Sequence, residues 1–158
     1  MDRSGANAKL RVAAIDIGTN TCLMLIGELD PNKGMTILAD EHAIVRLGEN
    51  VDKSRKITDE AYARLSSTLT KYRSIIDELQ VTDIAACGTS ALRDALNRDE
   101  ILARVKNDFD INISIIEGSR EAELTYLGAT FDLPPADGLT AVIDIGGGST
   151  EIAFGKNT

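Results

Sequence analysis

The sequence predicts an α/β protein with a mixed five-stranded sheet flanked by helices. The chain opens with three short apolar runs that only tight turns separate, and amphipathic helical segments then alternate with further short apolar runs. Strands joined by tight turns pair antiparallel, whereas strands joined by helices are expected to be parallel. The predicted order is strand, strand, strand, helix, strand, helix, strand, helix.

The first three strands are expected at 11–17, 22–29 and 35–45. Residues 18–21 (GTNT) and 30–34 (DPNKG) separate them, and both segments consist largely of residues that favour turns. Three sequential strands of this kind predict an antiparallel meander at the start of the fold.

A long amphipathic helix is expected at 58–79. Thr58 is its predicted N-cap, and Asp59 and Glu60 follow in the first turn, where the helix dipole favours negative charge. Apolar residues recur every three or four positions along it, at Ala61, Leu65, Leu69, Tyr72, Ile76 and Leu79. We expect this stripe to lie in the core and to carry no chemistry.

The elements after this helix are shorter. A buried strand is expected at 83–87, and a helix begins near Ser90. That helix is expected to break near 97–99, where Asp99 can cap a continuation. Another strand and another helix follow, at 111–116 and 119–131.

Residues 132–138 (DLPPADG) hold two of the three prolines and form the clearest linker in the chain, with strands expected after it at 140–145 and 151–155. An isolated two-stranded hairpin is marginally stable in water, so we expect a fragment of a protein roughly twice as long or longer, with little or no activity alone. The predicted division is a first domain at 1–118, a connecting helix and linker at 119–138, and the opening hairpin of a second, truncated domain at 139–158.

An internal repeat is the most informative feature of the sequence. Residues 13–27 (AAIDIGTNTCLMLIG) align without a gap with residues 141–155 (AVIDIGGGSTEIAFG), at an offset of 141 − 13 = 128 positions. An aspartate at the end of a buried strand is costly unless a partner such as a metal-bound water meets it. The glycines that follow let backbone N–H groups approach phosphate oxygens. Three consecutive glycines at 146–148 predict the close approach of a ligand, although Asp-x-Gly can also simply end a strand.

Composition excludes several classes of protein. The net charge of −8 argues against nucleic acid as the main partner. No apolar run approaches the ~20 residues of a membrane span, and residues 1–9 are too polar for a signal peptide. Cys22 and Cys87 lie within apolar runs, which is typical of reduced, buried thiols. We therefore expect a cytoplasmic protein with no membrane partner.

Five blocks of the sequence resemble the exopolyphosphatase/guanosine pentaphosphate phosphohydrolase family in order and spacing. They are AAIDIGTNT at 13–21, VRLGENV at 45–51, GTSALRDA at 88–95, EGSREAELTYLGA at 117–129 and VIDIGGGSTEI at 142–152. The resemblance implies a ribonuclease H-like fold, shared with actin, sugar kinases and heat-shock chaperones. It also implies Mg²⁺-dependent removal of terminal phosphates from inorganic polyphosphate, guanosine pentaphosphate or both, and it allows for a homodimer of the full-length protein.

The same resemblance implies roles for individual residues. Glu121 matches the family's catalytic glutamate, and Asp16, Asp144 and Glu151 match acidic positions expected to serve the metal and the nucleophilic water. Arg46 could either reach phosphate or pair with an acid. The positions that match the phosphate-binding segments are Gly18, Thr19, Asn20, Thr21, Thr89, Ser90, Arg93, Gly146, Gly147, Gly148, Ser149 and Thr150.

Phosphoryl transfer through a loose transition state needs mostly positioning and charge stabilisation. A glutamate with a reference pKa of about 4.3 is ionised at neutral pH and is sufficient to orient a water. The chain departs from the family where Arg120 and Glu123 replace the usual Glu and Arg around Glu121, and where Leu23 replaces an Arg or His. These changes alter charge beside the expected substrate path, so they leave the preference for long polyphosphate open.

Two other functions remain compatible with the sequence. One is an ATP-dependent kinase or ATPase of the same fold, which would need an adenosine-binding region. The other is a non-catalytic sensor that binds polyphosphate or nucleotide without cleaving it. Nucleotide binding by the complete protein distinguishes the first, and tight binding without turnover distinguishes the second.

Overall fold

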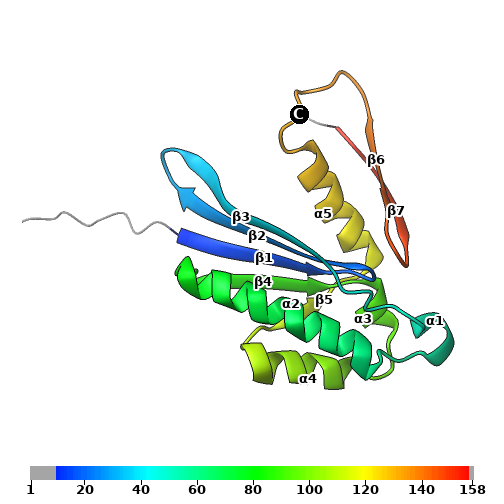
Figure 1. The fold of residues 1–158 in the computed structure, drawn as a ribbon. Coiled ribbons are helices and arrows are strands. Elements are labelled where there is room, and N and C mark those ends of the chain that lie inside the picture. The colour runs from blue at the N-terminus through cyan, green and yellow to red at the C-terminus, as the bar shows by residue number, and fades with distance from the viewer. Residues whose placement is uncertain (1–9, 157–158) are drawn as a thin grey trace, which may run out of the picture.

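The structure, a computed structural model, describes residues 10–156 (Figure 1), so the prediction for residues 1–9 lies outside the described part. The helices and strands of residues 10–130 follow the predicted order, with one short helix added. The full set is β1 (Leu10–Ile17), β2 (Thr21–Asp30), β3 (Gly34–Ile44), α1 (Val51–Ser54), α2 (Asp59–Glu78), β4 (Asp83–Gly88), α3 (Ser90–Asp94), α4 (Arg98–Phe109), β5 (Ile113–Ile115), α5 (Gly118–Thr130), β6 (Thr140–Ile145) and β7 (Thr150–Gly155).

A five-stranded sheet in the order β3-β2-β1-β4-β5 forms the body of the molecule. β1 pairs antiparallel with β2, and β2 with β3, because tight turns join them. β4 lies parallel to both β1 and β5, because helices connect these strands. The mixed five-stranded sheet predicted from the sequence is therefore confirmed.

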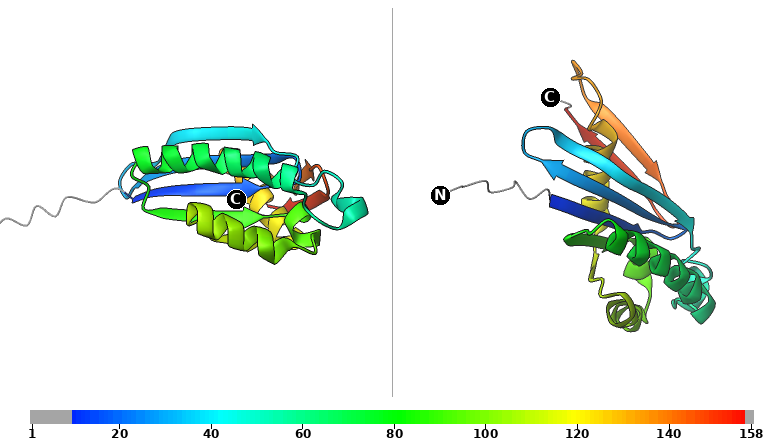
Figure 2. Two further views of the ribbon diagram at one scale, coloured as in Figure 1. Left: turned by 60° about the horizontal axis from the view of Figure 1, so that its bottom comes forward. Right: turned by 60° about the vertical axis from the view of Figure 1, so that its left-hand side comes forward.

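Helix α2 covers one face of this sheet, with α4 beside it (Figure 2). The predicted stripe of α2 is core, since Ala61, Leu65, Leu69, Tyr72 and Ile76 are buried. The predicted cap is also confirmed, because the Thr58 side chain accepts a hydrogen bond from the Ala61 N–H at 3.2 Å. The hydroxyl of Tyr72 donates to the carbonyl of Cys22 at 2.7 Å and ties the helix to β2.

The break between α3 and α4 falls where the sequence predicted it, but Asp99 does not cap the second helix. Asn97 occupies the N-cap position, and its side chain bonds the N–H and the carbonyl of Ile57 at 3.0 and 2.9 Å instead of the helix. Asp99 lies in the first turn of α4. The long-range contact of Asn97 therefore sets the start of this helix, and local sequence does not reveal such a contact.

Three smaller differences have similar causes. The helical turn α1 was not predicted. The strand predicted at 111–116 is shorter, because Ile111 packs in the core outside the sheet ladder. Cys22 is buried as expected, whereas Cys87 is only half-buried because its side chain lies on the face of the sheet away from α2. Neither cysteine forms a disulfide.

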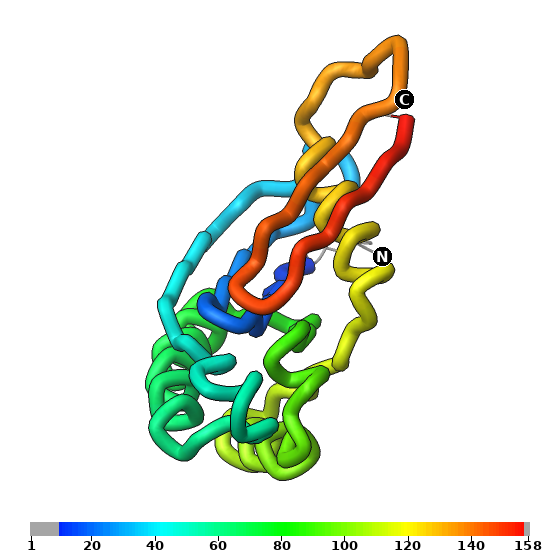
Figure 3. Tube along the Cα trace, turned by 90° about the vertical axis from the view of Figure 1, so that its right-hand side faces the viewer, coloured from blue at the N-terminus to red at the C-terminus, as the bar shows by residue number. Residues whose placement is uncertain are grey.

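Strands β6 and β7 form a separate two-stranded sheet that packs on α5. Figure 3 shows the turn of this hairpin beside the turn between β1 and β2, although 128 positions separate the two in the chain. Within residues 10–156 no helix is long and apolar enough to cross a membrane.

Candidate active site

The two hairpins of the sequence repeat share one turn geometry. Asp16 pairs with Leu23 across the first hairpin, and Asp144 pairs with Glu151 at the same register in the second. Each turn is closed by one backbone bond, from Gly18 N to Thr21 O at 2.9 Å and from Gly146 N to Ser149 O at 3.0 Å. The strands therefore hold an aspartate two residues before the first glycine of the turn in both copies.

The two turns meet closely, and this contact explains two of the three consecutive glycines. A Cβ atom on Gly147 would lie 2.5 Å from Nδ2 of Asn20. One on Gly148 would lie 2.7 Å from the hydroxyl oxygens of Thr19 and Ser90. The sequence attributed the glycines to an approaching ligand, but at these two positions the neighbouring atoms belong to the protein itself.

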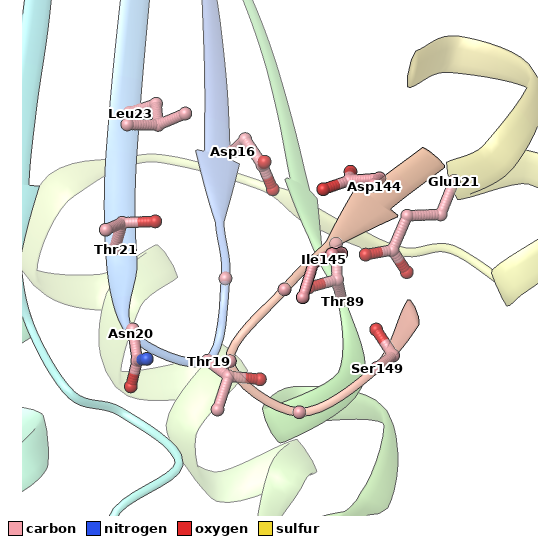
Figure 4. Close-up of a pocket in the computed structure, with 14 residues that line it drawn as sticks. Asp16, Thr19, Asn20, Thr21, Leu23, Thr89, Glu121, Asp144, Ile145 and Ser149 are labelled. Carbon is pink, nitrogen blue, oxygen red and sulfur yellow. The ribbon is translucent and has the colours of Figure 1, made fainter. Parts of the chain in front are cut away.

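A pocket of about 360 Å³ opens where the turns meet (Figure 4). It collects most of the predicted site residues from four separate segments of the chain. Its lining consists of Asp16, Gly18, Thr19, Asn20, Thr21, Leu23, Thr89, Glu121, Asp144, Ile145, Gly146, Gly147, Gly148 and Ser149.

Four predicted site residues do not line this pocket. Ser90 is buried behind it, against Gly148, and Thr150 is exposed at the start of β7. Glu151 lies close enough to Glu121 for its charge to affect that carboxylate. Arg93 reaches Glu121 instead of the pocket.

The turns leave several backbone N–H groups available to bind an anion. Those of Gly18 and Gly146 close the turns, as described above. The N–H groups of Thr19, Asn20, Gly147, Gly148 and Ser149 donate to no acceptor within the described part of the chain. Successive free amides of this kind form concave sites that bind phosphate oxygens.

The loop after β3 holds the first turn in place, and this role was not predicted. The N–H groups of Val45 and Arg46 both donate to the Asn20 carbonyl, at 2.8 and 2.9 Å, and Gly48 N donates to the Thr19 carbonyl at 2.9 Å. A Cβ on Gly48 would lie 2.3 Å from the Thr19 methyl group, so only glycine fits there. The Arg46 side chain is exposed and forms no ion pair with any residue that the structure describes. Pairing with an acid, one of its two predicted roles, is therefore not observed.

Three carboxylates face the same space in Figure 4: those of Asp16, Asp144 and Glu121. Burial in the pocket raises the pKa of Asp16 above its ordinary value, and the negative charge of Asp144 adds to this effect. The Cys87 thiol, whose Sγ lies 3.7 Å from the Asp16 carboxylate, acts in the opposite direction. The two aspartates thus lie near enough to repel each other, and a cation between them would relieve that repulsion.

Glu121 is held at the start of α5 by Arg93 of α3. Nη1 of Arg93 lies 3.3 Å from Glu121 Oε2 and also donates to the Ile116 carbonyl at 2.9 Å. Both side chains are largely buried, with 20% and 15% of their surface exposed. Burial raises the pKa of Glu121, Arg93 lowers it, and the charges of Glu151 and Asp16 raise it again, so that the net direction is upward.

The donor set suits Mg²⁺. Within residues 10–156 no group of three or more histidine, cysteine or acidic side chains is close enough to hold a metal by itself. Mg²⁺ does not need such a group, because it commonly binds one or two carboxylates together with substrate phosphates and water. Asp16 and Asp144, whose charges already interact, fit this pattern.

Leu23 and Ile145 also line the pocket. Leu23 was expected beside the substrate path, whereas no role was predicted for Ile145. The repeat gave no signal for Ile145, because its counterpart Ile17 is buried in the core. Cys87 and Thr125 line a smaller adjoining cavity of about 230 Å³ together with Asp16 and Glu121. Cys87 is placed beside Asp16 by the pairing of β4 with β1, whereas the position of Thr125 depends on how α5 packs against the sheet, which no local pattern indicates. Burial and the nearby Asp16 charge raise the pKa of Cys87 to about 12, so its thiol stays protonated.

Comparison with known protein sequences relates this chain to phosphatases. The sequence model of the Ppx/GppA phosphatase family matches residues 25–158. A bifunctional 3-dehydroquinate synthase/phosphatase of Fusobacterium nucleatum is 39% identical over 91% of this chain and 23% of its own length. Exopolyphosphatase 2 of Mycobacterium tuberculosis is 37% identical over 95% of this chain and 50% of its own length. The chain thus spans half or less of the length of these relatives.

Solved structures agree. An exopolyphosphatase from Cytophaga hutchinsonii superposes with a TM-score of 0.88 at 38% identity, over 93% of this chain and 47% of that one. The Aquifex aeolicus member of the Ppx/GppA family superposes with a TM-score of 0.81 at 32% identity, over 94% and 48%. The predicted ribonuclease H-like α/β class, which is that of the actin-like ATPases, is confirmed by these neighbours.

Proposed function

This chain belongs to the Ppx/GppA phosphatase family, and from that premise we propose that the protein hydrolyses terminal phosphoanhydride bonds of inorganic polyphosphate, guanosine pentaphosphate or both. One observation carries the proposal. Two glycine turns with free backbone N–H groups border the same pocket as the carboxylates of Asp16, Asp144 and Glu121. Such a pocket offers donors for phosphate oxygens on one side and acceptors for a water molecule or cation on the other.

In this mechanism the free amides and the hydroxyls of Thr19, Thr89 and Ser149 bind the terminal phosphate. Glu121 accepts a hydrogen bond from a water molecule and directs it at the terminal phosphorus atom. The water oxygen bonds to phosphorus while the bridging P–O bond breaks, and the bridging oxygen leaves with the shortened chain. Glu121 takes up the proton of the water, and its raised pKa makes it a better proton acceptor than an ordinary glutamate.

Arg93 has a different role from the one first predicted. Its guanidinium contacts Glu121 and the Ile116 carbonyl, so we assign it to holding the glutamate ionised and oriented. Two other predicted phosphate contacts lie outside the pocket: Ser90 supports the second turn through Gly148, and Thr150 is exposed at the start of β7. Phosphate binding then falls to the turns and to Thr89.

We propose that Asp16 and Asp144 hold Mg²⁺, with Glu151 available beside them. Bound Mg²⁺ would balance the negative charge that develops on the transferred phosphate and the leaving oxygen. Without that cation the carboxylates of the pocket would repel an anionic substrate. The net charge of the whole chain, −8, has the same sign as the substrate. Removal of divalent ions with a chelator is therefore expected to abolish phosphate release.

The decisive experiment measures phosphate release by the complete protein from medium-chain polyphosphate and from guanosine pentaphosphate, each with Mg²⁺. Glu121→Gln is expected to lower turnover by about 10²–10⁴-fold, because it removes the proton acceptor while keeping the shape of the side chain. Glu123→Gln is the matched control, since Glu123 lies on the same helix, is exposed and pairs with Arg120.

The following results would contradict the proposal. One is that the complete wild-type protein releases phosphate from neither substrate, and another is that Glu121→Gln leaves turnover unchanged. Alternatively, the protein would transfer phosphate from ATP in preference to both substrates, which would favour the kinase or ATPase. Tight polyphosphate binding without turnover, equal in wild type and Glu121→Gln, would identify the non-catalytic sensor.

A further inference from the structure

Helix α5 carries a second polar side chain toward the site, one turn after Glu121. Thr125 follows Glu121 by four positions, so the two lie on the same face of the helix. The hydroxyl of Thr125 donates to Oδ2 of Asp144 at 3.2 Å. It also borders the cavity of about 230 Å³ behind the phosphate pocket, which Asp16 and Glu121 line as well.

This contact is unlike those of the other threonines within helices of the described chain. Thr68, Thr70 and Thr130 each donate to the carbonyl four residues earlier in their own helix, at 3.1, 2.9 and 2.8 Å. That local bond is the usual one for a helical threonine. Thr125 has the same option at the Glu121 carbonyl but donates to a strand 19 residues away. Its hydroxyl is therefore directed by the site and not by the helix.

The partner of this bond makes it relevant to function. Asp144 is the residue before the end of β6, and Thr125 provides the one side-chain hydrogen bond to its carboxylate within residues 10–156. A donor on Oδ2 fixes the rotation of the carboxylate and leaves Oδ1 free for another partner. Hydrogen bonds of this kind orient metal-binding carboxylates, and their loss typically weakens metal binding or activity by about 10–100-fold.

We propose that Thr125 is a positioning residue that holds the Asp144 carboxylate in the orientation its metal site requires. The inference rests on the proposed role of Asp144 in binding Mg²⁺. It makes α5 the element that organises both halves of the reaction, with Glu121 directed at the water and Thr125 holding a carboxylate of the second hairpin. The equivalent aspartate of the first hairpin, Asp16, has the Cys87 thiol as its side-chain neighbour.

The test compares three variants of the complete protein. Thr125→Val removes the hydroxyl and keeps the shape, Thr125→Ser keeps the hydroxyl, and Thr130→Val removes a hydroxyl elsewhere on the same helix. Binding of Mg²⁺, and of Mn²⁺ as a second probe, is measured by calorimetry in the presence of inorganic phosphate, because Mg²⁺ commonly binds one or two carboxylates together with phosphate oxygens. Thermal unfolding is followed for all proteins, and Thr125→Ala replaces Thr125→Val if the latter does not fold.

We expect Thr125→Val to weaken metal binding by about 10–100-fold and to raise the Mg²⁺ concentration needed for half-maximal turnover by a similar factor. Thr125→Ser should bind metal like the wild type, and Thr130→Val should change neither readout. Wild-type metal binding by Thr125→Val would overturn the inference, and so would equal losses in Thr125→Val and Thr130→Val. Failure of the proposed function is distinguishable, because there the wild type itself would bind no metal or release no phosphate.

Discussion

The β1–β2 and β6–β7 hairpins have the same register and the same turn but different surroundings. The first is flanked by β3 and β4 and covered by α2, whereas the second forms a sheet of its own, whose strands pack on α5 and whose turn lies against the turn of the first hairpin. Side chains at equivalent positions therefore differ widely in exposure. Ile15 and Ile26 are 2% and 0% exposed, while their counterparts Ile143 and Phe154 are 62% and 69% exposed.

This difference separates what a hairpin sequence determines from what its neighbours determine. The turn and the strand register recur in both copies, because cross-strand pairing and the glycine turn fix them locally. The apolar side chains are buried only in the first copy, because their burial requires a covering helix and two further strands. On this basis we propose that residues 139–158 open a second domain whose sheet is completed by further strands, with 1–118 as the first domain and 119–138 as the connection.

The largest expected effect comes from replacing isoleucine with alanine at equivalent positions of the two hairpins. In the 158-residue chain, Ile15→Ala should lower the free energy of unfolding by about 2–5 kcal/mol, since it leaves a cavity beneath α2. Ile143→Ala should lower it by less than about 1 kcal/mol, because that side chain is mostly exposed. Urea unfolding followed by circular dichroism measures both.

The same pair also tests the proposed second domain. If β6 is a core strand of that domain, Ile143→Ala should become as costly as Ile15→Ala in the complete protein. Equal costs already in the 158-residue chain would show that a neighbouring copy or another surface covers the second hairpin in solution. A low cost in both proteins would contradict the proposed domain.

Much of the first domain was predictable because its signals are local. Three examples are the three-residue and four-residue spacing of apolar side chains in α2, the Thr58 cap and the turn after Ile17. In each of them the residues that interact are only a few positions apart in the sequence. The failures involve contacts over long sequence separation. Asn97 bonds Ile57 across 40 positions and thereby displaces the predicted cap, and Ile111 leaves the ladder to pack in the core.

The candidate site divides in the same way. The repeat indicated both turns and both aspartates, because similar sequences adopt similar backbone conformations. It did not indicate that Arg93 would contact Glu121, or that Thr125 would reach Asp144, since both contacts depend on where α5 packs. Nor did it indicate that Gly147 and Gly148 make room for Asn20, Thr19 and Ser90.

A smaller effect is expected at Glu121, whose ion pair with Arg93 joins α5, the helix that packs on the second hairpin, to α3. The pKa of Glu121 is raised by burial, and Arg93 opposes that rise. The reaction needs the ionised carboxylate, so activity falls as the pH drops through this pKa. Arg93→Gln removes the opposing cation, and the acidic limb of the pH–rate profile should move to higher pH.

Arg93→Lys serves as the comparison, because it keeps the positive charge but not the fixed geometry of the guanidinium. Its acidic limb should lie between those of wild type and Arg93→Gln. The profiles are measured as kcat/KM for phosphate release by the complete protein over the acidic to neutral range. An acidic limb that stays in place, or moves to lower pH, in Arg93→Gln would show that Arg93 does not hold Glu121 ionised.

The smallest expected effect concerns two tyrosines that pack a helix onto each hairpin. Tyr72 of α2 donates its hydroxyl to the carbonyls of Cys22 and Glu41, at 2.7 and 3.2 Å. Tyr126 of α5 lies against Gly155 of β7, and its buried hydroxyl has no hydrogen-bond partner within the described residues. Tyr72→Phe should therefore lower the free energy of unfolding by about 1 kcal/mol, because it removes a buried hydrogen bond between α2 and β2.

Tyr126→Phe should have the opposite sign or no effect, because it removes a hydroxyl that loses its hydration on folding and gains nothing in return. We expect a change between zero and about 1 kcal/mol toward greater stability, measured by urea unfolding of the 158-residue chain. A clear loss of stability would mean that the Tyr126 hydroxyl has a partner in solution, such as a bound water. All polar groups between α5 and β7 would then have hydrogen-bond partners. The two hairpins would differ only in the exposure of the face of the second hairpin that points away from α5.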